Sequence, residues 1–168
     1  MKKLTRKDAL TVGDILADVA RSEIMPRFRG AVASSTRMKA SAFDVVTDAD
    51  EAAEREISER LRRHFPGAVL IGEEAAGRDP EILGQIGTAD LAFIVDPIDG
   101  TKNFASGVPL FGVMAAATVR GEVALGAIHD PLCGDTAFAL RAEGAWRQGD
   151  DGAASDLQVA EPVPLAEI

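Results

Sequence analysis

The stretch Leu91-Ala-Phe-Ile-Val-Asp-Pro-Ile-Asp-Gly-Thr101 decides much of the fold of this 168-residue chain. Its first five residues, 91–95, form a continuous apolar run, which is typical of a buried strand bounded by a turn. Pro97 stiffens the chain where it leaves the strand. Asp96 and Asp99 are three residues apart across the predicted turn, so both carboxylates can point at one site.

The end of this stretch is suited to binding an anion. Gly100 has no side chain, so the backbone N–H groups around it can approach a phosphate closely. A helix that begins near Thr101 would add further N–H groups directed at the same anion. The carbonyl oxygen of Ile98 and the hydroxyl of Thr101 can also face the neighbouring carboxylates.

A second apolar strand, Ala68–Gly72, also runs directly into two carboxylates, Glu73 and Glu74. Carboxylates at the mouths of adjacent strands repel one another unless a cation lies between them. Mg²⁺ prefers oxygen ligands of this kind. Asp-Pro and Asp-Gly alone are as typical of a plain turn, and a Glu pair is often merely solvated. The two strand ends together favour a metal site.

Two helices are predicted before these strands, over Leu10–Phe28 and from Thr47 to the His64–Gly67 segment. Thr47 and Asp50 have the spacing of a capping box, with Asp in the place of the usual Glu or Gln. The apolar face of the second helix repeats every four residues at Ala53, Ile57 and Leu61. The small and polar segment Gly30–Ala42 between the helices is predicted to be a loop.

The rest of the chain is strand-rich. Residues 75–90 are predicted to be irregular or weakly helical, and the chain from Gln148 onward is rich in Asp, Gly, Ala and Ser. Arg120-Gly121 is a candidate tight turn between two strands. The predicted strands are Leu110–Val119, Glu122–His129, Thr136–Leu140 and Gly144–Arg147. Two helices followed by consecutive strands indicate an α+β fold, with the helices packed on a largely antiparallel sheet.

Composition restricts the function. The formal net charge is −9, which disfavours binding of a nucleic-acid polymer. An anionic substrate would then need local positive charge, which a divalent metal ion supplies. The single cysteine, Cys133, excludes a disulfide within the chain and fits a cytoplasmic protein. The longest apolar stretch, residues 113–119, is too short to span a membrane.

Several motifs resemble those of a known family. Asp96–Thr101 resembles the first signature of the inositol monophosphatase superfamily, and Ile71–Glu74 is similar to its upstream metal-ligand motif. Asp44–Asp50 is similar to the segment that opens the family's second helix. His129–Pro131 and Ala142–Trp146 also fit the family pattern.

The resemblance implies an architecture and a boundary. Residues 1–168 would form the amino-terminal metal- and phosphate-binding domain of the layered αβαβα fold, with the family's carboxy-terminal domain absent. A truncated product and a natural short form are both compatible with this expectation. Without the second layer, an apolar edge or face of the sheet should be exposed, and we expect a homodimer.

The resemblance also implies a role for each site residue. Asp50 would pair with Thr101 to orient the attacking water, with Glu73 as a third catalytic residue. The amides of Gly100 and Thr101, with Lys39 nearby, would bind the phosphate. The implied Mg²⁺ ligands are Glu73, Asp96, Ile98, Asp99 and Thr101. The metal would activate the water, neutralise the phosphate and stabilise the leaving alkoxide, and inhibition by lithium is implied as well.

The predicted function is therefore a magnesium-dependent phosphomonoesterase that acts on a small polyol phosphate such as myo-inositol 1-phosphate. Histidinol phosphate and a 3′-phosphoadenosine nucleotide are alternative substrates. Asn103-Phe104 looks like the inositol monophosphatases, whereas Lys102 recurs in the nucleotidases. A different kind of alternative is an inactive, truncated form that binds metal or phosphate without hydrolysis.

Overall fold

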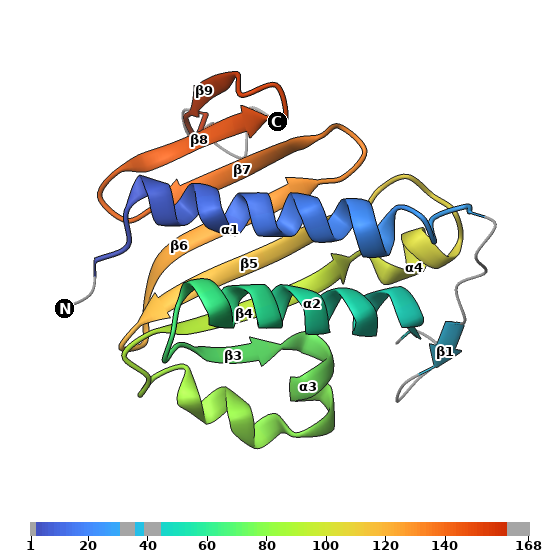
Figure 1. The fold of residues 1–168 in the computed structure, drawn as a ribbon, viewed down its shortest axis with the longest axis horizontal. Helices are drawn as coiled ribbons and strands as arrows, with labels where there is room; N and C mark the ends of the chain where they lie inside the picture. Colours follow the sequence, from blue (N-terminus) through green and yellow to red (C-terminus); the bar gives the residue numbers. More distant parts are fainter. Residues whose placement is uncertain (1–2, 31–35, 39–44, 161–168) are drawn as a thin grey trace, which may run out of the picture.

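The computed structural model describes residues 3–30, 36–38 and 45–160. Two long helices lie side by side across one face of a seven-stranded sheet, whose strand order is β3-β4-β5-β6-β7-β8-β9 (Figure 1). The helical elements are α1 (Arg6–Val19), η1 (Ala20–Ile24), α2 (Asp48–His64), α3 (Glu73–Arg78), η2 (Pro80–Gln85) and α4 (Thr101–Ala105). The strands are β1 (Thr36–Met38), β2 (Val45–Thr47), β3 (Val69–Gly72), β4 (Ala92–Asp99), β5 (Gly112–Val119), β6 (Glu122–Asp130), β7 (Asp135–Leu140), β8 (Gly144–Gly149) and β9 (Ala154–Leu157).

The predicted α+β class is confirmed. Every neighbouring pair in the large sheet is antiparallel except β3 and β4, which run parallel. That one parallel pair places the ends of both strands at the same edge of the sheet. Arg120 and Gly121 form the predicted turn between β5 and β6, with φ angles of 52° and 81°. Positive φ at both positions is what a two-residue hairpin turn requires.

The first helix begins earlier than Leu10, where the sequence analysis placed its start. Thr5 is its N-cap, because the Asp8 carboxylate accepts a hydrogen bond from the Thr5 N–H at 2.8 Å and the Asp8 N–H donates to the Thr5 hydroxyl at 3.3 Å. This reciprocal capping box gives hydrogen-bond partners to two backbone N–H groups, those of Thr5 and Asp8, that would otherwise have none at the helix start. The segment from Ala20 to Ile24 then widens into a π-helix.

The second helix has the predicted start and the predicted buried face. The Asp50 carboxylate accepts hydrogen bonds from the Thr47 N–H at 2.8 Å and the Thr47 hydroxyl at 2.6 Å. Three side chains of its apolar face are fully buried against the sheet: Ala53, Ile57 and Leu61. Its last turn carries basic residues, which interact favourably with the partial negative charge of a helix C-terminus.

Three segments differ from the secondary structure predicted from the sequence. The strand β1 lies within the expected loop 30–42, and it pairs with β2. The strand β9 lies in the Asp-, Gly-, Ala- and Ser-rich segment after Gln148, where no strand was predicted, and it pairs with β8. The strand β4 continues as far as Asp99, where a turn was expected, because Asp99 pairs with Gly112 of β5. All three depend on a partner strand, which local composition does not specify.

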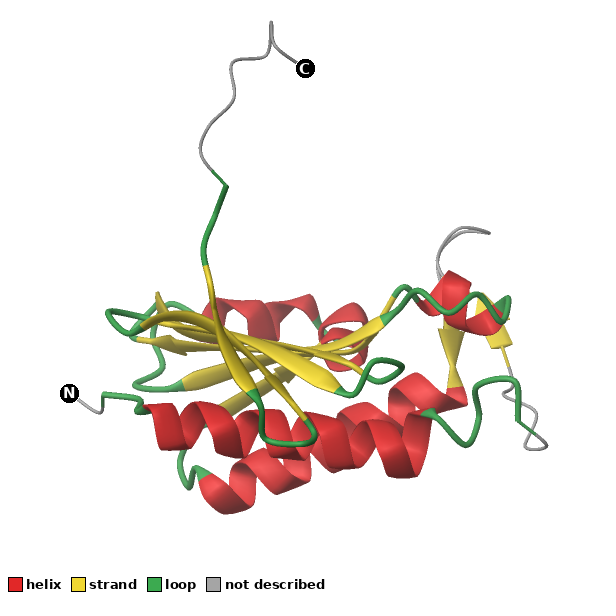
Figure 2. Cartoon of the chain, turned by 90° about the horizontal axis from the view of Figure 1, so that it is seen from above, coloured by secondary structure: helices red, strands yellow, loops and turns green. Residues whose placement is uncertain are grey.

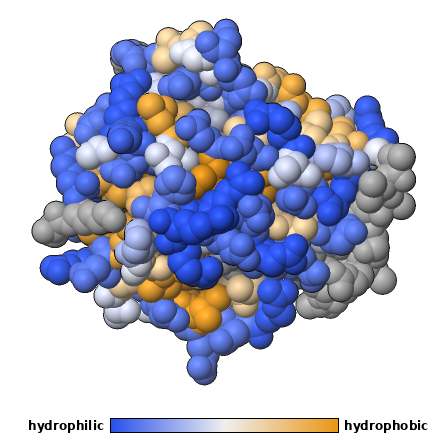
Figure 3. Space-filling view, in the orientation of Figure 1, coloured by the Kyte–Doolittle hydropathy of each residue, from blue (hydrophilic) through white to orange (hydrophobic). Residues whose placement is uncertain are grey.

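The core lies between the helix layer and the sheet. Aromatic pairs connect its parts: Phe65 packs on Phe93 with ring centroids 4.9 Å apart, and Phe138 stacks on Trp146 at 5.1 Å. The outer surface of the helix layer is mainly hydrophilic (Figure 3). Helices α1 and α2 therefore each bury one face and expose the other to solvent, as amphipathic helices do.

The opposite face of the sheet is covered only in part. Figure 2 shows α1 and α2 on one side of the sheet and only short helical segments on the other. On the outer face of β6, Val123 is 60% exposed and Ile128 is 52% exposed. An exposed apolar sheet face was expected, and it is present in the described part of the chain. No helix among the described residues is long and apolar enough to cross a membrane.

Candidate metal and phosphate site

The parallel pairing of β3 and β4 brings the two acidic strand ends together. Gly72, the last residue of β3, lies opposite Val95 of β4 in the register. The residues that follow, Glu73 and Asp96, therefore leave the paired region at the same level. Two segments more than twenty residues apart in the sequence thus deliver carboxylates to one edge of the sheet.

A β-bulge brings Asp99 to the same region. Asp96 pairs with Met114 and Asp99 pairs with Gly112, so two residues of β4 lie opposite a single residue of β5. In a regular strand, side chains three residues apart point to opposite faces. The extra residue of the bulge shifts this alternation, so that the charge of Asp99 acts on Asp96.

Asp96 is the most perturbed group of this edge. Burial, followed by the negative charges of Glu73 and Asp99, raises the pKa of Asp96 from 3.8 to about 7, and Asp50 adds a smaller effect. One of its oxygens, Oδ1, is buried without a hydrogen-bond partner. Buried polar atoms are almost always hydrogen-bonded. An orphaned carboxylate oxygen surrounded by like charges fits a cation ligand.

Thr101 links the three elements around this edge. Its hydroxyl oxygen lies 2.9 Å from the Ile98 carbonyl oxygen of β4 and 3.2 Å from Asp50 Oδ1 of α2. The single hydroxyl hydrogen can be donated to only one of these acceptors at a time. Asp50 is fully buried, and its other oxygen, Oδ2, belongs to the capping box with Thr47. Burial raises the pKa of Asp50, and the hydrogen bonds from Thr47 and Thr101 oppose the rise.

Gly100 is required by the path of the chain into α4. Its φ angle is +93°, which lies in the region that favours glycine. A Cβ atom at this position would lie 2.9 Å from the Leu110 carbonyl oxygen. The sequence analysis assigned this glycine to the approach of a phosphate. The structure shows an independent reason, which is close contact with the backbone that precedes β5.

The predicted ligands meet at one edge but do not enclose a common point. The described residues contain no group of three or more His, Cys, Asp or Glu side chains close enough to hold one ion. Glu73 is exposed, whereas the neighbouring Glu74 is buried. Lys39, which was predicted to lie near the phosphate, falls outside the described residues.

The sequence analysis missed Glu54, a buried acidic residue next to this edge. Its carboxylate accepts hydrogen bonds from the backbone N–H groups of Glu74 at 2.6 Å and Ala75 at 3.1 Å. Glu54 lies one helical turn after Asp50, on the same face of α2 as Ile57. An acidic residue on an otherwise apolar face is the signal that could have identified it.

An α+β sheet with acidic strand ends and an orphaned buried carboxylate oxygen defines a candidate cation-binding domain. The sequence matches the model of the inositol monophosphatase family over residues 5–167, and the chain belongs to this family.

The relatives support the same assignment. The chain is 36% identical over 124 residues to a Thermotoga maritima protein named fructose-1,6-bisphosphatase/inositol-1-monophosphatase, covering 74% of this chain and 43% of the relative. The solved structure of Thermotoga maritima IMPase superposes with a TM-score of 0.74 at 28% identity, covering 94% of this chain and 55% of that one. An IMPase/NADP phosphatase complexed with Mg²⁺ and phosphate superposes with a TM-score of 0.60 at 25% identity, covering 79% and 46% of the two chains. The chain thus spans about half the length of these relatives or less.

Proposed function

We propose that this chain is the metal- and phosphate-binding part of a magnesium-dependent phosphomonoesterase that acts on a small polyol phosphate such as myo-inositol 1-phosphate. The observation that carries the proposal is Asp96, whose Oδ1 is buried without a hydrogen-bond partner, and whose pKa is raised to about 7 by burial and then by the neighbouring carboxylates. A bound cation would resolve that arrangement without protonating the group. The relative with bound Mg²⁺ and phosphate supports the choice of metal and anion.

The metal would be held by oxygen atoms from three segments. Its proposed ligands are Glu73, Asp96, the Ile98 carbonyl, Asp99 and the Thr101 hydroxyl. This set consists only of hard oxygen donors, which Mg²⁺ prefers over softer ligands. When bound, the metal would lower the pKa of a water molecule and offset negative charge on the phosphate and the leaving oxygen.

The protein itself would orient the attacking water through Asp50 and Thr101. Asp50 Oδ1 lies 3.2 Å from the Thr101 hydroxyl oxygen and can accept its hydrogen. When it does, the Thr101 oxygen has lone pairs left with which to accept a hydrogen bond from water. The capping box fixes Asp50 at the start of α2, so the acceptor is held in one position. Glu73 is proposed as the third catalytic residue.

The phosphate would bind at the beginning of α4. The N–H groups of Gly100 and Thr101 precede the first turn of this helix, whose backbone does not use them internally. Lys39 is proposed to contribute positive charge. Asn103 is not among the proposed phosphate-binding residues, and its side-chain amide donates to the Leu110 carbonyl oxygen at 2.8 Å.

Other substrates of the same chemical class are testable alternatives. Histidinol phosphate and 3′-phosphoadenosine nucleotides share the phosphate monoester but differ in the group that leaves. The relative named IMPase/NADP phosphatase is a reason to include a nucleotide among the substrates tested. We further propose that the protein is a cytoplasmic homodimer, that it is inhibited by lithium, and that its partners include neither a nucleic-acid polymer nor a membrane.

A second candidate function is binding without hydrolysis. The chain covers only 43% of the Thermotoga maritima relative, so groups contributed by the rest of such a protein would be missing from this chain alone. In that case residues 1–168 would bind Mg²⁺ and phosphate but leave phosphate esters intact.

The test is phosphate release from myo-inositol 1-phosphate by the 168-residue chain, with and without Mg²⁺, beside Asp96→Asn. Hydrolysis that requires both Mg²⁺ and Asp96 would establish the enzyme, and the same assay on histidinol phosphate and a 3′-phosphoadenosine nucleotide would rank the substrates. Calorimetric Mg²⁺ binding without hydrolysis of any ester would favour the binding form. A chain that neither binds Mg²⁺ nor hydrolyses an ester would refute both candidates.

A further inference from the structure

Glu54 lies beside the carboxylate edge, which is the edge of the sheet that carries Glu73, Asp96 and Asp99. It belongs neither to the proposed metal ligands nor to the proposed catalytic residues. It is 7% exposed and comes from the middle of the buried face of α2. Its two oxygens accept hydrogen bonds from the N–H groups of Glu74 and Ala75, at 2.6 and 3.1 Å. These amides belong to the first turn of α3, where N–H groups have no partner within the helix.

Glu54 replaces the local cap that α3 lacks. The N-cap residue of α3 is Gly72, which has no side chain with which to accept a hydrogen bond. A carboxylate twenty residues earlier in the chain therefore takes the place of the usual Ser, Thr, Asp or Asn. This contact joins α2 directly to the segment that carries Glu73.

Gly72 and Glu54 are matched sterically. A Cβ atom on Gly72 would lie 2.1 Å from Glu54 Cδ and within 2.5 Å of both carboxylate oxygens. The backbone angles of Gly72, φ −89° and ψ 156°, are accessible to any residue. Glycine is therefore needed here for the space that the Glu54 carboxylate occupies, and not for conformational freedom.

Only a few groups around Glu54 stabilise its charged form. A guanidinium nitrogen of Arg78 lies 4.0 Å from Glu54 Oε1, but the Arg78 side chain is 64% exposed. Both amides donate to the carboxylate, and an ionised carboxylate can accept from both at once. An amide side chain at this position would place an NH₂ group against one of the two N–H donors.

We propose that Glu54 is a positioning residue that fixes the backbone from Glu73 to Ala75, so that the Glu73 carboxylate stands beside Asp96 and the edge binds a divalent cation tightly. The inference rests on the proposed function only in requiring that this edge binds Mg²⁺. Glu54 itself touches neither the metal nor the substrate. Its effect passes through the two hydrogen bonds to α3 and through the space left by Gly72.

The first test is the Mg²⁺ affinity of the whole 168-residue chain, measured by calorimetry for wild type and Glu54→Gln. The amide removes one acceptor without changing the size of the side chain, and we expect binding to weaken about 10- to 100-fold. Glu59→Gln, an exposed position on the same helix, is the matched control and should bind like wild type. Unchanged affinity in Glu54→Gln, with only a lower Tm, would show a merely structural role and overturn the proposal.

A double-mutant cycle tests the steric match. Gly72→Ala should weaken Mg²⁺ binding as Glu54→Gln does, because the added methyl group displaces the carboxylate. In a Glu54→Ala background the same glycine substitution should cause little further loss, since the carboxylate is already gone. Gly77→Ala, where an added Cβ meets no atom within 4 Å, is the control within α3. If the losses of Mg²⁺ affinity caused by the two substitutions simply added, the two residues would not act through the same contact.

A readout that needs no metal separates this inference from the proposed function. Amide hydrogen exchange by NMR should become about 10-fold faster at Glu74 and Ala75 in Glu54→Gln and in Gly72→Ala, because a hydrogen bond of this kind is lost. Amides in the middle of α2 should keep their rates. A wild-type chain that binds no Mg²⁺ would refute the proposed function and with it the effect of Glu54 on cation binding, whereas hydrogen exchange would still decide whether Glu54 fixes the backbone from Glu73 to Ala75. Unchanged exchange at both amides would refute the role of Glu54.

Discussion

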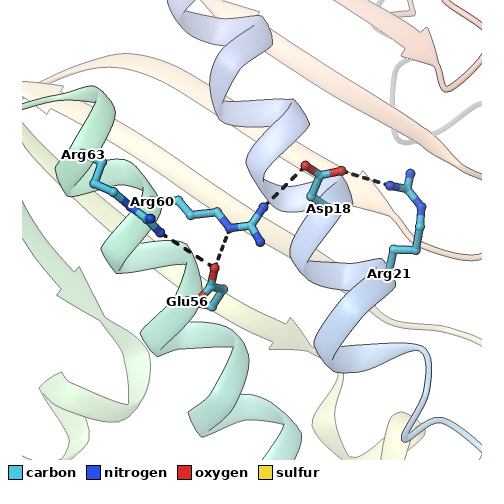
Figure 4. A network of polar contacts seen from close by, with 5 residues as sticks. All are labelled: Asp18, Arg21, Glu56, Arg60 and Arg63. Carbon is cyan, nitrogen blue, oxygen red and sulfur yellow. Dashed lines mark hydrogen bonds and ion pairs between the residues drawn. The ribbon is translucent and has the colours of Figure 1, made fainter.

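Two charged regions of this molecule are built on opposite principles. Between α1 and α2, charges of opposite sign alternate on the protein surface (Figure 4). Arg60 lies 2.7 Å from Glu56 and 3.4 Å from Asp18, while Arg21 also reaches Asp18 at 3.0 Å and Arg63 reaches Glu56 at 3.9 Å. Their side chains are 30% to 66% exposed, so water solvates every member of this network.

The carboxylate edge gathers charges of one sign. Glu73, Asp99 and Asp50 all raise the pKa of Asp96, after the larger effect of its burial. Among the residues that the structure describes, the buried oxygen Oδ1 of Asp96 has no hydrogen-bond partner. Without a bound cation, the carboxylate edge is therefore unfavourable for folding. The surface network needs no cation, and its contribution to stability is zero or slightly favourable.

The difference separates stability from function. Exposed ion pairs contribute little to stability, because water already solvates the separate charges. Unfavourable like-charge clusters persist at functional sites, where a bound ligand offsets them. The following experiments test that distinction, in order of the effect that we expect.

Asp96→Asn should have the largest effect. Removing the negative charge of Asp96 should weaken Mg²⁺ binding by about 100-fold or more. Even residues that only support metal ligands contribute about 10- to 100-fold to metal affinity. Calorimetry measures the affinity directly. Asp18→Asn, in the surface network, should bind Mg²⁺ like wild type. Equal losses in both variants would show that the two regions do not differ as described.

Gly100→Ala should follow in size. The substitution forces a positive φ on alanine and places a Cβ atom 2.9 Å from the Leu110 carbonyl oxygen, which should lower stability by about 1–3 kcal/mol. Urea unfolding measures the change. Gly126→Ala is the control, because its added Cβ meets no atom within 4 Å. Equal stability of the two variants would mean that the path into α4 is not constrained.

The pH dependence of the metal-free protein should reveal the like charges. The folded-state pKa of Asp96, about 7, is above its ordinary value of 3.8. The folded state therefore holds more protons than the unfolded state between these values, and this group's contribution to stability is lost as the pH rises from about 4 to 7.

Thermal unfolding in EDTA at several pH values tests this sign. At pH 8, Asp96→Asn should unfold a few degrees higher than wild type, by roughly 2–8 °C, and the two proteins should converge near pH 4. If the stability of wild type instead rose relative to Asp96→Asn over this pH range, the pKa of Asp96 would be lowered in the folded state. That result would contradict a cluster of like charges around Asp96.

Asp18→Asn should have the smallest effect. It removes one of the acidic partners of Arg21 and of Arg60, yet we expect a loss of at most about 1 kcal/mol, because both contacts are solvent-exposed. Urea unfolding at low salt and in 0.5 M NaCl checks this, since salt should shrink the difference. A loss well above this value that resists salt would place the network in the stable core of the fold.

Much of the candidate site could be predicted from local sequence. The capping box of Thr47 and Asp50 works over three residues, so its spacing is visible in the chain. The run into Asp96, Asp99 and Gly100 is also local, and its residues lie at one edge as expected. The bulge in β4 was not predicted, because it exists only through the pairing with β5.

The contact between Glu54 and Gly72 was missed for the same reason. Each residue has an ordinary local role, as a polar helix residue and as the end of a strand. Their match appears only when α2 packs across the end of β3. The segment of β1 was predicted to be a loop and β9 was not predicted, because short strands take their stability from a neighbouring strand.

The sequence by itself determined which residue types lie at the two strand ends, where the second helix begins and how the β5–β6 turn is made. These features depend on hydrogen bonds and steric preferences within a few residues. Tertiary structure alone decided that β3 and β4 run parallel, that Oδ1 of Asp96 is buried without a hydrogen-bond partner and that Glu54 caps α3. These features join segments distant in the sequence, and burial and like-charge repulsion arise only when those segments meet.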